Sequence, residues 1–243
     1  MTKAIALILG VGAAEGIGGA LCLRASNAGH HVVAVGRTRE KLDALVTRIK
    51  VIGGSAEGHV ADLSDATAIN NLFDSTDSLS GNLNFVVYNA GNSFRHSTAD
   101  MSEEFFEEAW RICCFGGFVA GRAAANRMVE NTKGSILFTG ATASVKSRPP
   151  FIAFAAAKAG LRATAAGLAR EYGPKGVHVA HVIIDGGVEG AIRRKRLPKK
   201  DDNAGTNELL SPSAIAEAYW QLHLQHPSAW SFEMDLRPFN EVF

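Results

Sequence analysis

The feature that most constrains the fold is the alternation of short apolar runs with helix-length segments along nearly the whole chain. The apolar runs predict β-strands at Lys3–Leu9, His31–Val35, Ala56–Val60, Asn84–Tyr88, Ser135–Thr139 and His178–Ile184. Most are apolar nearly throughout, which is typical of parallel strands covered on both faces. The segments between them predict helices at Ile17–Ala28, Glu40–Ile52, Asp65–Asp77, Met101–Glu130 and Phe151–Glu171. Strands and helices alternating at this spacing form right-handed βαβ units, so we expect an α/β fold with a Rossmann-type, doubly wound parallel sheet.

Residues typical of helix ends mark several boundaries. Asp100, with Glu103 three residues later, predicts a capping box at the start of a helix. The pair Ser211-Pro212 predicts the start of a further helix, because serine is a common N-cap and proline suits the first helical position. Gly29 and Gly173 stand where helix C-caps are expected.

Length and composition favour one domain over residues 1–243. Of the 243 residues, 47% are hydrophobic and 20% charged, a balance that excludes intrinsic disorder. No repeat or linker divides the chain. The polar segment 186–210 has no clear periodicity, and a long loop in a compact domain predicts a mobile lid. Its cations, including Arg193–Arg196, fit a solvated surface helix better than an anion-attracting lid.

The charge balance and the cysteines exclude several classes of protein. The formal net charge of +1 lacks the electrostatic footprint of a nucleic-acid or anionic-membrane binder. Cys22, Cys113 and Cys114 have neither metal-ligand spacing nor a disulfide pattern, so we expect no metal site and a reduced, cytoplasmic setting. No apolar run reaches the ~18 residues of a membrane span. The first strand begins at Lys3, which leaves no room for a signal peptide.

A glycine cluster follows the first predicted strand. Gly12, Gly16 and Gly18 come between that strand and a helix that begins at Ile17. Glycines here allow a tight turn and close approach of the backbone to a pyrophosphate, which the N–H groups and dipole of the helix N-terminus attract. The cluster therefore predicts a dinucleotide-binding site.

The residue after the second strand predicts which dinucleotide is preferred. An NAD enzyme places an acidic residue there to accept hydrogen bonds from the ribose 2′-hydroxyl. This chain has Arg37, whose planar, permanently charged fork matches a 2′-phosphate, so NADP(H) is favoured over NAD(H). Glu15 in the glycine loop argues weakly in the opposite direction, because its carboxylate would repel that phosphate.

Over nearly its whole length the chain resembles the short-chain dehydrogenase/reductase family. The glycine loop is similar to the family's cofactor loop, although Val11 stands where a threonine is usual. Three further motifs resemble the family's adenine-contacting pair, its strand-closing Asn-Ala-Gly signature and its active-site lysine; they are Asp62-Leu63, Asn89-Ala90-Gly91 and Lys158. The resemblance implies an NAD(P)-binding Rossmann fold, a small-molecule substrate, and a homodimer or homotetramer.

The resemblance fails at the other catalytic positions. The family uses an Asn-Ser-Tyr-Lys set, with tyrosine four residues before the lysine and serine thirteen before the tyrosine. The tyrosine position falls on Phe154, the serine position on Ala141 beside Thr142, and the asparagine position on Cys113. A variant that places tyrosine seven residues before lysine also fails, because Phe151 stands there. The chain therefore resembles a divergent member of the family that retains Lys158 alone.

Other groups are weaker candidates for the missing proton donor. Arg95 and His96 follow the Asn-Ala-Gly turn, but an exposed loop histidine is the more frequent case. Cys113 fits a small core residue better than a nucleophile. The cations of the Ser144–Arg148 loop are expected to line the pocket and to suit a carboxylate or phosphate.

Three further polar residues lie in or just after the sixth predicted strand. We interpret His178 and His181 as structural. Asp185 is expected near the nicotinamide end of the site, without an assigned role.

Three functions remain open at this point. The first is an oxidoreductase of unknown substrate with a rearranged proton-transfer system, since hydride transfer itself requires only a correctly placed cofactor. The second is a non-catalytic NADP(H)-binding sensor or scaffold. The third, a hydratase or isomerase that uses the same pocket, has the least support.

Overall fold

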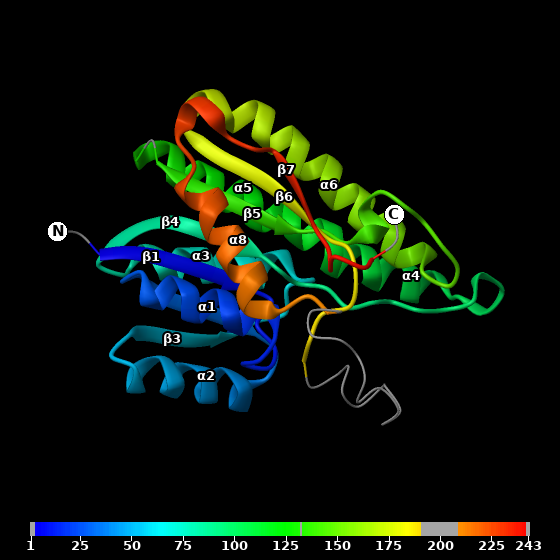
Figure 1. Ribbon diagram of the computed structural model, residues 1–243, viewed down its shortest axis with the longest axis horizontal. Coiled ribbons are helices and arrows are strands. Elements are labelled where there is room, and N and C mark those ends of the chain that lie inside the picture. The colour runs from blue at the N-terminus through cyan, green and yellow to red at the C-terminus, as the bar shows by residue number, and fades with distance from the viewer. Residues whose placement is uncertain (1–2, 132, 191–208, 242–243) are drawn as a thin grey trace.

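The predicted strands form one parallel sheet at the centre of the molecule (Figure 1). The computed structural model describes residues 3–131, 133–190 and 209–241. Within these ranges the sheet has seven strands in the order β3-β2-β1-β4-β5-β6-β7. Their bounds are Lys3–Leu9 (β1), His31–Gly36 (β2), Ser55–Val60 (β3), Gly81–Tyr88 (β4), Gly134–Thr139 (β5), Val177–Ile184 (β6) and Glu233–Leu236 (β7). The predicted Rossmann-type sheet is confirmed, and β7 is an addition to it.

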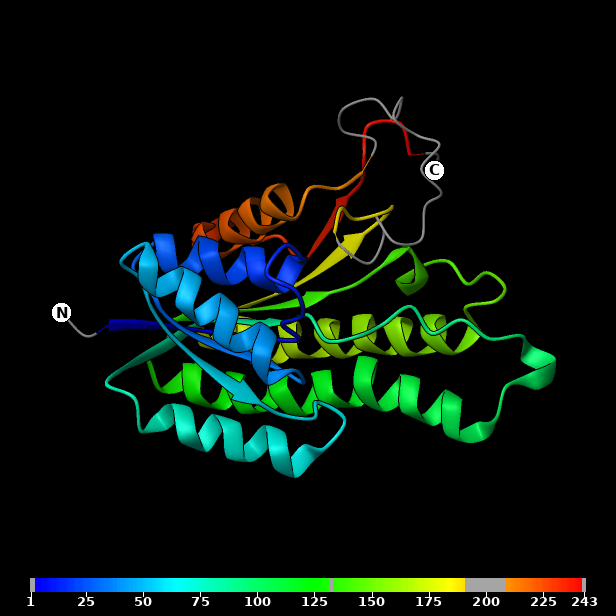
Figure 2. The same ribbon diagram turned by 90° about the horizontal axis from the view of Figure 1, so that it is seen from below.

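Helices cover both faces of the sheet, as Figure 2 shows. One face carries α1 (Ile17–Asn27), α2 (Arg39–Val51) and α8 (Pro212–Leu224). The other carries α3 (Ala66–Asp77), α5 (Gly116–Asn131) and α6 (Ile152–Tyr172), with α4 (Glu103–Trp110) packed against α6. Each face buries its own apolar core, which explains why the central strands β1, β2, β4 and β5 are nearly continuous apolar runs. No helix in the described ranges is long and apolar enough to cross a membrane.

The single long helix predicted over Met101–Glu130 is wrong in detail. The helix α4 ends at Trp110, a π-helical turn occupies Arg111–Phe115, and α5 continues from Gly116. The turn has a specific partner, because the Tyr88 hydroxyl donates a hydrogen bond of 2.6 Å to the carbonyl of Ile112.

The predicted helix ends are partly confirmed. The N-cap of α4 is Ser102, whose hydroxyl accepts the Phe105 N–H at 3.2 Å, and not Asp100, which lies in a separate 3-10 turn. The start of α8 at Pro212 after Ser211 is confirmed. Gly29, at φ +86°, follows α1 as expected.

Gly173 is the C-cap of α6, as expected, but it does not adopt the left-handed conformation. Its backbone is right-handed and begins a short 3-10 turn. The left-handed residue is Gly176, at φ +88°, which turns the chain into β6.

Part of the predicted lid over residues 186–210 lies outside the described residues, together with the cations Arg193–Arg196. The described ends of that segment are joined, since a parallel bridge pairs Val188 with Leu210.

Two histidines are held in low-polarity surroundings beside the sheet. His181 on β6 is fully buried, with Nδ1 at 3.0 Å from a carboxylate oxygen of Glu233. His223 on α8 has Nδ1 at 2.6 Å from the Ser135 hydroxyl. Burial lowers the pKa of each to about 4, and for His181 it outweighs the opposing effect of Glu233.

We expect the free energy of unfolding to fall on acidification between about pH 6.5 and about pH 4. Over that range the unfolded histidines bind protons that the folded ones exclude, so stability is complete above the unfolded pKa and declines as pH falls toward the folded value. Each histidine contributes a slope approaching about 1.4 kcal/mol per pH unit. Urea unfolding at several pH values measures this slope, and His223→Gln should remove one histidine's share. An equally steep slope in that variant would contradict the assignment.

Candidate functional site

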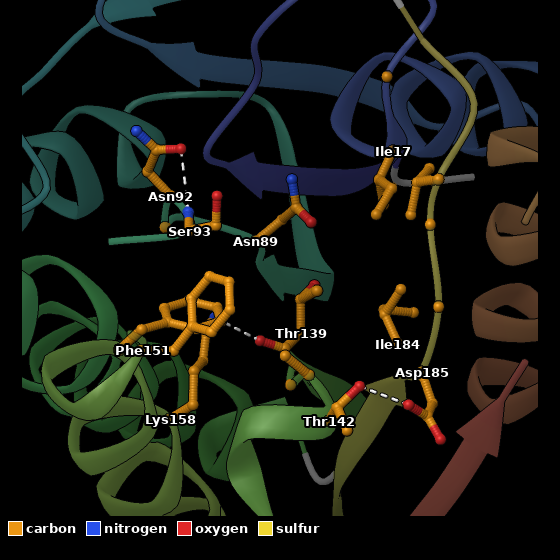
Figure 3. A pocket seen from close by; sticks show the side chains of 18 of the residues that line it. Ile17, Asn89, Asn92, Ser93, Thr139, Thr142, Phe151, Lys158, Ile184 and Asp185 are labelled. Carbon is orange, nitrogen blue, oxygen red and sulfur yellow. Dashed lines mark hydrogen bonds between the residues drawn. The ribbon is translucent and has the colours of Figure 1, made fainter. Parts of the chain in front are cut away.

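A cleft of about 1150 Å³ opens at the carboxyl ends of β1, β4, β5 and β6 (Figure 3). It lies next to the point where the chain reverses its direction along the sheet, between β1 and β4. Doubly wound sheets bind their ligands at such switch points, outside the carboxyl ends of the strands. The cleft is therefore the candidate functional site.

The glycine loop forms one wall of the cleft, and the predicted residues Gly12, Gly16, Ile17 and Gly18 all line it. A Cβ at Gly18 would lie 3.0 Å from the Gly10 carbonyl oxygen, so the helix packs closely on the turn. Gly12 has no neighbour within 4 Å of such an atom and leaves open space. The loop thus packs closely against the turn at Gly10 on one side and leaves open space over Gly12 on the other.

The helix α1 begins at this wall with its N–H groups unblocked. Its N-cap is Gly16, which has no side chain to cap it, and the first turn contains no acidic residue. The first N–H groups of any α-helix lack intrahelical partners, and the dipole adds positive character there. This end of the cleft suits an anionic group.

The predicted adenine-end residues do not line the cleft. Arg37 is exposed at the end of β2, and Asp62 is exposed after β3. The pKa of Asp62 is lowered mainly by hydrogen bonds from the Ser64 N–H and hydroxyl, with a smaller contribution from Arg37. Leu63 is buried in the core.

The Asn-Ala-Gly turn joins the first and fourth strands. The Asn89 side-chain amide donates a hydrogen bond of 2.9 Å to the Gly10 carbonyl, and its backbone N–H donates one of 2.7 Å to the Leu9 carbonyl. Asn89 and Gly91 line the cleft, whereas Ala90 is buried behind them.

Lys158 brings a cation to the floor of the cleft. Its ammonium donates a 2.7 Å hydrogen bond to the Thr139 carbonyl, and the residue is 3% exposed. Burial lowers the pKa of this ammonium. The ring centroid of Phe154 lies 5.8 Å from Nζ, and Phe154, Phe151 and Ala141 line the cleft beside it. The immediate surroundings of Lys158 therefore contain aromatic and methyl groups.

No tyrosine of the described residues lines the cleft. The hydroxyls of Tyr88, Tyr172 and Tyr219 are bound elsewhere, to the carbonyl of Ile112 and the side chains of Asn126 and Thr139.

Two residues considered as alternative reactive groups, Cys113 and His96, also lie outside the lining. Cys113 is fully buried, and burial raises the pKa of its thiol, which disfavours a nucleophilic thiolate. His96 is not a lining residue, although its neighbour Arg95 is. The loop cations Lys146 and Arg148 line the cleft as expected.

A polar cluster on the opposite side of the cleft was only partly foreseen. The Thr142 hydroxyl donates a hydrogen bond to the Asp185 carboxylate, as Figure 3 shows. Arg237, just beyond β7, approaches the other oxygen of Asp185 at 3.3 Å. The sequence signal was present in Asp185, but its partner Arg237 follows a strand too short to predict.

A second cluster supports the floor from below. Ser144 accepts the Ala141 N–H at 3.1 Å and lies 3.3 Å from Nε2 of the buried His181. Ser144 is itself buried and does not line the cleft. These contacts fix the 3-10 turn Thr142–Ser144.

The described residues contain no group of three or more His, Cys, Asp or Glu side chains arranged to hold a metal ion.

Comparison with known proteins gives a consistent result. The short chain dehydrogenase family matches residues 5–201. Among curated proteins, 2,3-dihydro-2,3-dihydroxybenzoate dehydrogenase of Bacillus subtilis (strain 168) is 31% identical over 148 residues, which are 61% of this chain and 57% of that protein. A fatty acyl-CoA reductase of Mycobacterium tuberculosis is 34% identical over 175 residues, or 70% of this chain and 59% of the relative. The matched segment thus spans little more than half the length of these relatives.

Two solved structures match over almost their entire length. A short-chain dehydrogenase from Rhodopseudomonas palustris has a TM-score of 0.83 and 34% identity, covering 97% of this chain and 99% of that one. A metagenomic short-chain oxidoreductase in complex with NADP has a TM-score of 0.82 and 25% identity, and the match covers 98% of this chain and 97% of that one.

Proposed function

The chain belongs to the short-chain dehydrogenase family, and on that premise we propose that it is an NADP(H)-binding oxidoreductase acting on a CH–OH or C=O group of a small molecule. The observation that carries the proposal is one cleft that contains both the open glycine loop and the buried Lys158 ammonium. A relative of similar fold is described in complex with NADP, which supports this cofactor. We propose further that residues 1–243 form one cofactor-binding domain in a reduced, cytoplasmic setting, which the free, buried cysteines support.

The described residues fit a dinucleotide whose nicotinamide and pyrophosphate would lie in the cleft and whose adenine end would extend beyond it to the exposed Arg37 and Asp62. The space over Gly12 and the N-terminus of α1 would hold the pyrophosphate, with Gly16, Ile17 and Gly18 beneath it. Lys158 and the Asn89-Ala90-Gly91 turn would hold the nicotinamide ribose end. Arg37 would bind the 2′-phosphate, and Asp62 and Leu63 would contact the adenine. The bound nicotinamide supplies or accepts a hydride, whereas the protein positions it and manages the proton.

The cofactor preference is tested by replacing Arg37. We expect NADPH to bind more tightly than NADH. Arg37→Asp should reverse this order, so that NADH binds more tightly than NADPH by about tenfold or more. A carboxylate repels the 2′-phosphate of NADPH and accepts a hydrogen bond from the 2′-hydroxyl of NADH. Fluorescence titration measures both affinities. Arg48→Asp on α2 makes the same charge change as a control and should preserve the order. Equal affinities for the two cofactors in the native protein would remove the NADP assignment.

We propose that the catalytic set is incomplete. Phe154 and Ala141 stand where the family has its tyrosine and serine, and Cys113 where it has asparagine. The absence of a hydroxyl at 154 and 141, together with the location of all three tyrosine hydroxyls elsewhere in the described chain, supports this proposal. A positioned proton donor contributes about 10²–10⁴ in rate.

Restoring the hydroxyls tests this view. Native protein should reduce simple ketones slowly at neutral pH, and the double variant Phe154→Tyr, Ala141→Ser should be about 10² faster, because charge develops on the carbonyl oxygen beside these positions. Single-turnover NADPH oxidation measures the rate. Phe151→Tyr adds a hydroxyl to another lining residue and should bring no gain. A fast native rate that the double variant leaves unchanged would mean that a different group supplies the proton.

The missing hydroxyls also favour a second candidate, a non-catalytic NADP(H)-binding sensor or scaffold. Cofactor binding without turnover in both the native protein and the double variant would favour it over the enzyme.

We propose a homodimer or homotetramer that assembles through α4, α5 and α6, which cover most of the segments 101–130 and 151–171. Phe106, Trp110 and Phe118 on these helices are 38–40% exposed, and such apolar area is poorly covered in a monomer.

Charge substitution tests the assembly. Trp110→Glu and Phe118→Glu should yield monomers at micromolar concentration, because each would bury a charge at the interface. Val51→Glu, at an exposed apolar position on α2, serves as the control and should leave the assembly intact. Sedimentation velocity distinguishes the states, and a monomeric native protein would contradict the proposal.

A further inference from the structure

Thr142 and Asp185 form a hydrogen-bonded pair in the cleft to which the proposed function assigns no role. Thr142 begins the 3-10 turn after β5, and Asp185 directly follows β6, so neighbouring strand ends bring them together. Both residues line the cleft, and the Thr142 hydroxyl is the donor (Figure 3). They line the same cleft as Lys158 and Phe154, on its opposite side.

The position of the pair is fixed from both sides. The Asp185 backbone N–H donates a hydrogen bond of 2.8 Å to the Leu236 carbonyl. Arg237 approaches the Asp185 carboxylate, and the Asp185 side chain is only 14% exposed. On the other side, the contacts of Ser144 with the Ala141 N–H and with His181 hold the turn that carries Thr142. Two groups held in this way are preorganised for one geometry.

The arrangement leaves Thr142 able to accept a proton. A hydroxyl has one donor and two acceptor lone pairs, and the donor is used on Asp185. The Thr142 oxygen therefore offers an acceptor toward the cleft, and the carboxylate behind it is a base. Removing the Asp185 carboxylate from water costs free energy, and two apolar side chains packed at the same positions would not have this cost. A purely structural role therefore explains poorly why threonine and aspartate occupy these positions.

We propose that Thr142 and Asp185 are a proton relay that takes the place of the missing tyrosine only in part and supports the slow turnover expected of the native protein. As the carbinol C–H bond of an alcohol breaks and its hydride, with the electron pair, passes to NADP⁺, the alcohol O–H proton moves to the Thr142 oxygen. The proton of Thr142 moves at the same time to Asp185, and the carbonyl product forms. In the reverse direction protonated Asp185 returns the proton by the same path. Thr142 is the catalytic residue and Asp185 acts through it.

This inference depends on the proposed oxidoreductase function, so the test separates the two. Cyclohexanol and a panel of other secondary alcohols serve as substrates with NADP⁺. The tertiary alcohol 1-methylcyclohexanol has a hydroxyl but no carbinol hydrogen, so it reports binding without turnover. Its dissociation constant is measured by NMR titration of the protein.

The variants at Asp185 and Thr142 should differ in their effects. Asp185→Asn should lower kcat about 10²-fold, because its amide still accepts from Thr142 but cannot take up a proton, while leaving tertiary-alcohol binding within about twofold of native. Thr142→Val should lower kcat by a similar factor and weaken that binding about fivefold, the value of one lost hydrogen bond. Thr142→Ser keeps the hydroxyl and should therefore retain both the native kcat and the native affinity for the tertiary alcohol.

The pH profile gives a signature that a structural role would not. Between about pH 6 and about pH 9, the rate of alcohol oxidation should rise with pH more steeply in Asp185→Asn than in the native protein, because hydroxide must then take up the proton that Asp185 accepts in the native protein. Asp235→Asn is the control, since Asp235 lines the same cleft and pairs with Arg237 but not with Thr142.

Each failure has a distinct outcome. If the native protein is active and Asp185→Asn is equally fast, the relay is wrong and the proposed function stands. An equal loss in Asp235→Asn would trace the effect to Arg237 and also overturn the relay. A native protein that binds NADP⁺ but oxidises no alcohol of the panel overturns the proposed function, and the relay with it.

Discussion

The contact between the ends of β1 and β4 is the constraint on which the site depends. Gly10 has a φ of +96°, and a Cβ there would lie 2.4 Å from the Ala90 nitrogen, so only glycine allows this approach. The Asn89 amide closes the same junction by a hydrogen bond to the Gly10 carbonyl. Because β1 also leads directly into the glycine loop and α1, the junction places the wall formed by that loop opposite Lys158. A side chain at residue 10 would displace that wall from the rest of the cleft.

Much of the fold was predictable because it follows from local sequence. The apolar runs indicated the first six strands to within a few residues, since strands buried on both faces need nearly continuous apolar sequence. Glu233–Leu236 was missed because β7 is short and half polar, and its pairing with β6 depends on tertiary contact. The division between α4 and α5 was missed for a related reason, since its π-helical turn is bonded to Tyr88 from a distant strand.

The site was predictable where a motif carries it and unpredictable where distant segments meet. The glycine loop was predicted from its place between a strand and a helix, and Asn89 and Lys158 from their resemblance to family motifs. All three line one cleft. Gly10 was missed, although it begins the same glycine cluster. The position of Thr142 against Asp185 requires knowing that β5 and β6 are neighbours and that Arg237 returns beside them. The cleft therefore combines a predictable binding half with a half defined by long-range packing.

The π-helical turn at Arg111–Phe115 also sets the rotational phase between two helices. In an unbroken α-helix, Trp110 and Phe118 would be rotated from each other by about 80°. A π turn accommodates one extra residue, equivalent to about 100° of rotation, and brings the two side chains to within about 20° of the same direction. Phe106 lies about 40° from Trp110, so the aromatic residues of both helices form one continuous strip. Removing one residue from the turn would restore a regular α-helix and keep that strip aligned, because the two side chains would then be seven residues, or about 700°, apart. Regularising the turn at its present length would instead rotate Trp110 and Phe118 about 80° apart and divide the strip.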